Sequence, residues 1–200
     1  MGAGDSPAPE WLEYTINDHI NAIKKTVKDL RITTPLVIAG HSMGGVLALN
    51  FAMKNQVKRV MAISAPIISP VTDRTILEKF NVMSIKTLGS LASGNPILYS
   101  IAKSMHTLST HKNYDVNKLA FRKTLKHVIL ENDSMGNIKK LPIPIYLLRG
   151  TSDLLSNHQN YQLASKMKNV SVQEVPLSGH QIRGPLMTAV LKHLVQIIRK

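Results

Sequence analysis

The chain has 200 residues, 44% of them hydrophobic and 18% charged, which is enough for one domain with a buried core and excludes a mainly disordered protein. It contains no Cys, so disulfides, thiolate metal sites and a Cys nucleophile are excluded. The formal net charge of +13 raises the question of an anionic partner.

The positive charge has little local organisation. Basic residues are scattered, only 4% of residues are aromatic, and no nucleic-acid-binding module can be recognised, so we expect no nucleic-acid partner. The densest basic stripe, Lys118, Arg122 and Lys126, shares one helical face, which is more typical of a solvated surface than of an anion-binding one. No apolar run reaches the roughly 18 residues of a spanning helix, and residues 1–20 lack the apolar stretch of a signal peptide. These features predict a cytoplasmic protein with no transmembrane segment.

The first predicted element is an amphipathic helix from Ile16 to about Leu30, because its apolar residues recur at spacings of four and three. Thr15 is suited to cap this helix, and Asp18 lies where its charge favours the helix start. After Pro35, the apolar residues 36–39 predict a strand buried on both faces, as in a parallel sheet covered by helices.

The alternation of strand and helix continues on both sides of a long middle segment. Before the middle segment, a helix is predicted at residues 46–54 and a strand at 57–64. After it, strands are predicted at 143–148 and 170–175, and helices at 157–167 and 186–198. The fold class is therefore α/β, a mostly parallel sheet with flanking helices.

Residues 67–140 lack the pattern of a buried strand and indicate several helical pieces, broken at residues 93–96 and 113–115. We expect a core formed by residues 1–66 and 141–200, with a helical insertion at 67–140.

The segment Gly40-His41-Ser42-Met43-Gly44 matches the pattern G-x-S-x-G and lies between a predicted strand and a predicted helix. The strand must reverse sharply into the helix, so we expect Ser42 to be strained and side chains at positions 40 and 44 to collide with neighbouring segments. The Ser42 hydroxyl would stand clear of the sheet, and the Met43 N–H would point at an oxyanion forming beside it. Ser42 is therefore a candidate nucleophile, and His41 is expected to point away from its hydroxyl and to pack.

A serine hydroxyl needs a general base, normally a His that a carboxylate orients. Asp153 follows the strand predicted at 143–148, and His180 follows the strand at 170–175, in the chain order nucleophile, acid, base. Asp133, upstream of the late strand, is a competing candidate for the acid.

With these motifs the chain resembles the α/β-hydrolase superfamily, in its broad group of esterases and lipases. The matching segments cover nearly the whole chain and are specific to the fold rather than to a substrate; they are residues 14–19, 39–45, 141–145, 150–153 and 178–180. The resemblance implies a catalytic triad of Ser42, Asp153 and His180, and a lid or cap at the insertion of residues 67–140.

Similar members of this superfamily begin with roughly four more strands, and an early turn there, often containing His-Gly, gives the second oxyanion donor. Here residues 2–6 resemble the loop after the fourth of those strands. We therefore expect a partial α/β-hydrolase fold whose exposed sheet edge is covered by a missing amino-terminal segment or by oligomer formation.

The function expected is that of a serine hydrolase, which cleaves an ester or related acyl bond of a small-molecule substrate through an acyl-enzyme. No cofactor and no metal ion are expected, since no zinc signature exists. A Ser nucleophile argues against dehalogenase or epoxide-hydrolase chemistry and leaves esterase, lipase, thioesterase, amidase, peptidase and carbon–carbon bond hydrolase open. The alternatives are a truncated, catalytically impaired fragment or binding module, and a protein that binds anionic surfaces.

Overall fold

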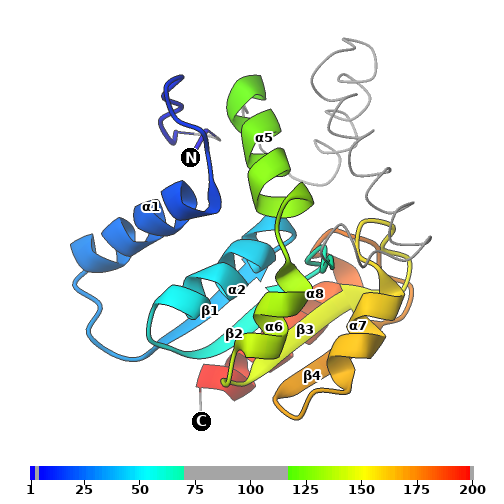
Figure 1. The fold of residues 1–200 in the computed structure, drawn as a ribbon. Coiled ribbons are helices and arrows are strands. Elements are labelled where there is room, and N and C mark those ends of the chain that lie inside the picture. Colours follow the sequence, from blue (N-terminus) through cyan, green and yellow to red (C-terminus); the bar gives the residue numbers. More distant parts are fainter. Residues whose placement is uncertain (3–4, 70–116, 199–200) are drawn as a thin grey trace.

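The computed structural model describes residues 1–2, 5–69 and 117–198 and contains a sheet of four strands. β1 (Leu36–His41), β2 (Val57–Ile63), β3 (Ile145–Gly150) and β4 (Val170–Val175) lie side by side in chain order (Figure 1). Each neighbouring pair is parallel, so the four carboxyl ends meet at one edge of the sheet. The predicted α/β class is confirmed.

Helices lie on both faces of this sheet (Figure 1). One face carries α2 (Met43–Lys54), α6 (Ser134–Lys140) and α7 (His158–Ser165), with α1 (Ile16–Asp29) beside α2. The opposite face carries α8 (Gly184–Ile198). This layering explains why residues 60–63 of β2 and 145–148 of β3 form unbroken apolar runs.

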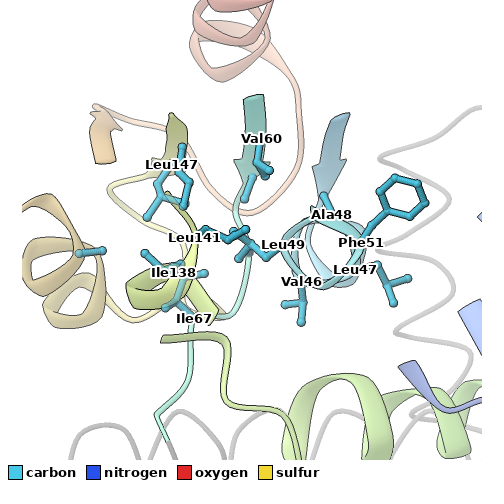
Figure 2. Packing of buried hydrophobic residues seen from close by; sticks show 14 of the residues in the cluster. Val46, Leu47, Ala48, Leu49, Phe51, Val60, Ile67, Ile138, Leu141 and Leu147 are labelled. Carbon is cyan, nitrogen blue, oxygen red and sulfur yellow. The ribbon is translucent and has the colours of Figure 1, made fainter. Parts of the chain in front are cut away.

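Two apolar clusters hold the layers together. Figure 2 shows the larger one, in which Leu49 of α2, Ile138 of α6 and Val60 of β2 belong to the same buried group. The smaller cluster lies on the other face, where Met61 packs with Leu186 of α8. Burying each such side chain contributes roughly 1.5–3 kcal/mol, so these clusters rather than helix propensity stabilise the sheet and its layers.

The start of α1 follows directly from the local sequence. The Thr15 hydroxyl accepts a hydrogen bond from the Asp18 N–H (3.3 Å), and the Asp18 carboxylate accepts one from the Thr15 N–H (2.8 Å). This reciprocal pair is a capping box, which satisfies two backbone donors that would otherwise be unpaired. The predicted cap is confirmed, and the helix ends at Asp29, before Pro35 as predicted.

Strand β1 is less buried than its sequence predicts. Five of its residues are half-buried and Ala39 is exposed, whereas β2 and β3 are mostly buried. The physical reason is position, because β1 is the edge strand and pairs only with β2 among the residues that the structure describes. The expectation of a strand buried on both faces was therefore wrong for β1.

The predicted insertion at residues 67–140 is only partly described. Residues 70–116, which include both predicted breaks, lie outside the described residues. The described carboxyl-terminal part of the insertion is helical and contains α5 (Lys118–Thr124), the π-helical segment η2 (Leu125–Leu130) and α6. Helix α6 packs between α2 and α7. The boundaries of a lid or cap stay a prediction.

A buried histidine links α1 to α5 and predicts how stability changes with pH. His19 is buried, its Nε2 lies 3.1 Å from the Thr124 hydroxyl, and burial lowers its pKa to about 4. The unfolded chain takes up this proton near the ordinary value of 6.5, before the folded protein does. Stability from this group is therefore present above pH 6.5 and is lost as the pH falls toward 4.

We expect His19 to account for roughly 3 kcal/mol of the stability lost between pH 7 and 4. Urea unfolding of the wild type and of His19→Gln at pH 7, 5.5 and 4.5 measures this, because Gln keeps polar groups and cannot titrate. The free energy of unfolding should fall less steeply in the variant. Equal slopes for both proteins would show that His19 does not titrate as the burial indicates.

Candidate active site

Ser42 lies in the sharp turn between β1 and α2. Its backbone is in the left-handed region, with φ 54° and ψ −122°, which is strained for a residue with a side chain. The Ser42 N–H donates to the Ile63 carbonyl (2.8 Å), and the Ser42 carbonyl accepts from the Gly45 N–H (2.9 Å). These bonds fasten the turn to β2 and to the first turn of α2, and the predicted strain at Ser42 is confirmed.

The glycines around Ser42 differ in whether a side chain could be accommodated at their positions. A Cβ on Gly40 would overlap the backbone of Gly44, and a Cβ on Gly45 would lie 2.8 Å from the Cβ of Ala65. A Cβ on Gly44 would meet no described atom within 4 Å. Among the described residues the expectation of a collision at position 44 was therefore wrong, because Gly44 already belongs to α2 and a Cβ there reaches none of their atoms outside its helix, while the close approach falls on Gly40 and Gly45.

The structure brings Ser42, His180 and Asp153 together at the carboxyl edge of the sheet. The His180 Nε2 lies 2.9 Å from the Ser42 Oγ, and the His180 Nδ1 lies 3.0 and 3.1 Å from the two Asp153 carboxylate oxygens. An ionised carboxylate only accepts, so the proton resides on Nδ1 and Nε2 is left to accept from the serine hydroxyl. The three residues predicted as a site are thus hydrogen-bonded in one line.

The carboxylate of Asp153 is fully buried. Burial alone would raise its pKa, but hydrogen bonds from His180, Ser156 and the Leu155 N–H, together with the charge of His180, hold the pKa below its usual value. Asp153 is therefore ionised near neutral pH and fixes the orientation of the imidazole.

The loop that presents Asp153 is held by Arg149, whose side chain is 5% exposed. Its Nη2 donates to the backbone carbonyls of Asp153 (3.1 Å) and Ser156 (3.3 Å), and its Nε donates to the Ser156 hydroxyl (3.0 Å). Glu174 on the neighbouring strand pairs with Nη1, so the buried guanidinium charge is compensated. Sequence reasoning missed this role, and the only signal was a charged residue in an otherwise apolar strand.

The competing acid candidate does not reach the site. Asp133 is the N-cap of α6, and its carboxylate accepts from the Gly136 N–H at 2.7 Å. Its role is that of a helix cap, which a carboxylate fills well at a helix start.

Met43 is the first residue of α2 and follows Ser42 directly. Its N–H makes no hydrogen bond with any residue that the structure describes. A free N–H at a helix start favours negative charge nearby, which agrees with the predicted oxyanion donor.

The described residues form a groove away from this edge, but no cluster suited to a metal ion and no membrane-spanning helix. A groove of about 720 Å³ lies at the opposite end of the sheet, at the amino ends of β1 to β3, with lining residues that include Thr34, Gln56 and Pro142. No group of three or more His, Asp or Glu side chains suited to a metal ion occurs among the described residues. Within residues 1–2, 5–69 and 117–198, no helix combines the length and the apolar character needed to span a bilayer.

The parallel sheet, the strained turn and the hydrogen-bonded Ser42, His180 and Asp153 are the features of an α/β hydrolase. The sequence profile of the family described as "Serine aminopeptidase, S33" matches residues 2–183, and the chain belongs to this family. The resemblance seen in the sequence is thereby confirmed.

Among curated proteins, the chain is similar to two from Arabidopsis thaliana. It is 34% identical over 82 residues to "Probable lysophospholipase BODYGUARD 4", which is 40% of this chain and 19% of that protein. It is 32% identical over 68 residues to "Probable lysophospholipase BODYGUARD 5", which is 33% of this chain and 15% of that protein. The chain thus matches less than a fifth of the length of either relative.

Solved structures show the same fold at low identity. An esterase from Exiguobacterium antarcticum superposes with a TM-score of 0.71 at 16% identity, covering 100% of this chain and 79% of that one. A structure from a study of carboxylesterases of Nitrososphaera gargenis superposes with a TM-score of 0.74 at 13% identity, covering 100% and 78%.

Proposed function

We propose that the protein is a serine hydrolase that cleaves carboxylic esters through an acyl-enzyme. The observation that supports this most strongly is that the His180 ring is hydrogen-bonded on one side to the Ser42 hydroxyl and on the other to the buried, ionised Asp153. This is the arrangement that makes a serine hydroxyl nucleophilic near neutral pH.

In the proposed reaction, the Ser42 oxygen attacks the ester carbonyl carbon while its proton moves to the His180 Nε2. The negative charge that forms on the carbonyl oxygen is stabilised by the Met43 N–H. His180 then gives the proton to the leaving alcohol, and the acyl group stays on Ser42. Water attacks this acyl-enzyme with His180 again as the base, which releases the carboxylic acid and restores the serine.

Esters are proposed rather than peptides because the names of the similar proteins describe lysophospholipases and esterases, which act on ester bonds. The family description names an aminopeptidase, so peptide substrates belong in the test.

The test is turnover of p-nitrophenyl esters with acyl chains of 2 to about 16 carbons, beside aminoacyl p-nitroanilides. We expect ester turnover, and we expect Ser42→Ala to lower kcat by at least about 10⁴-fold, because the nucleophile is removed. Turnover of the anilides alone would assign a peptidase. A folded wild type that turns over neither substrate would favour an impaired hydrolase or binding module instead.

A further inference from the structure

The ring of His41 contacts the base, although the proposed reaction does not use it. His41 is the last residue of β1 and directly precedes Ser42, and its side chain is half-buried. Its Nε2 lies 2.8 Å from the backbone carbonyl oxygen of His180. A carbonyl oxygen only accepts, so the His41 Nε2 carries a proton and donates it.

The two imidazoles also touch. The ring centres of His41 and His180 are 4.9 Å apart, and the planes are tilted by 49°. His41 therefore contacts the base at its main chain and at its ring, while the ring of His180 is also hydrogen-bonded to Ser42 and Asp153.

The backbone that carries His180 has few other attachments. The loop after β4 is tied to the loop after β3 by the Ser152 N–H, which donates to the Ser178 carbonyl at 2.9 Å. From residue 179 to the start of α8 at Gly184, the bond from His41 is the one hydrogen bond that joins this backbone to the sheet, within the part of the chain that the structure describes. The position of the base thus depends on the residue next to the nucleophile.

We propose that His41 is a positioning residue, which holds the main chain at His180 so that the ring meets the Ser42 hydroxyl. This inference rests on the proposed function. One short segment, His41-Ser42, then carries the nucleophile and fixes the base relative to it, so the two cannot move apart independently. Burial lowers the pKa of His41, which keeps its ring neutral and spares the neighbouring imidazole the repulsion that a second positive charge would cause when His180 takes up its proton.

The test compares His41→Phe and His41→Gln. Phe keeps an aromatic ring against His180 and loses the donor, whereas Gln loses the ring and keeps an N–H at about the place of Nε2. For His41→Phe we expect kcat for a p-nitrophenyl ester to fall by about 10–100-fold, because small misplacements of reacting groups cost that much. KM and the melting temperature should change little, and His41→Gln should recover most of the lost kcat.

The outcomes separate this inference from the proposed function when Ser42→Ala is measured alongside. If Ser42→Ala is inactive and His41→Phe keeps the kcat of the wild type, the positioning role is wrong and the hydrolase stands. If Phe and Gln lower kcat equally and both lower the melting temperature, His41 is only a packing residue and the inference is again wrong. An active Ser42→Ala, or a wild type that turns over no ester, would overturn the proposed function and this inference with it.

Discussion

Replacing Asp153 with Asn is expected to lower kcat for an ester by roughly 10⁴-fold. The carboxylate accepts a hydrogen bond from the His180 Nδ1–H at 3.0 Å, and an amide nitrogen in its place can donate to Nδ1 instead. The imidazole would then carry its proton on Nε2, which faces the Ser42 oxygen at 2.9 Å, and could no longer accept the hydroxyl proton. The variant should therefore fold and bind substrate with little turnover.

The matched control is Asp133→Asn, which removes the same charge from the other acid candidate. Asp133 caps α6 by accepting from the Gly136 N–H, and Asn caps a helix about equally well. Steady-state kinetics should show a kcat near that of the wild type for this variant. A kcat within tenfold of wild type in Asp153→Asn, or a large loss in Asp133→Asn, would mean that the acid has been assigned to the wrong residue.

Replacing Gly40 with Ala is expected to destabilise the protein by at least about 3 kcal/mol, because the new methyl would overlap the backbone of Gly44. Backbone atoms in this turn are fixed by the bonds of Ser42 to Ile63 and Gly45, so they cannot move aside cheaply. In a chain of this length the melting temperature should fall by roughly 6–12 °C. Thermal unfolding followed by circular dichroism measures the change.

Gly44→Ala is the control for this substitution, because it adds the same methyl four residues away. A Cβ there meets no described atom within 4 Å, and position 44 is in the first turn of α2. Ala favours a helix over Gly by about 1 kcal/mol, so stability should stay the same or rise slightly. Equal losses in both variants would show that the turn does not have the close approach at Gly40 described above.

The local elements of this fold could be predicted from the sequence because they rest on short-range physics. Thr15 is the predicted N-cap and Asp18 lies at the helix start as predicted, and the position of Ser42 between strand and helix follows from Gly40 and the apolar residues before it. The placement of Asp153 and His180 after two late strands also predicted that they lie close together, since parallel strands bring their carboxyl ends to one edge of the sheet.

The predictions that were wrong or missed concern residues whose surroundings are formed by segments distant in the sequence. The sequence of β1 is as apolar as that of an interior strand, and only its place at the edge of the described sheet explains the exposure of Ala39. Gly44 matches the pattern G-x-S-x-G as well as Gly40 does, and only the path of the backbone shows which of them is crowded. Arg149 could not be foreseen because its partners include Glu174 and two backbone carbonyls, which no spacing predicts.

The most direct measurement is the covalent reaction of the folded protein with a fluorophosphonate, followed by peptide mass spectrometry. The reagent phosphonylates a serine whose hydroxyl is activated by an adjacent base, and it needs no knowledge of the substrate. We predict one adduct, on the peptide that contains Ser42, which is absent in Ser42→Ala and formed far more slowly in His180→Gln. An adduct on another residue, or no adduct on a protein shown to be folded, would contradict the assignment of Ser42 as a nucleophile activated by His180.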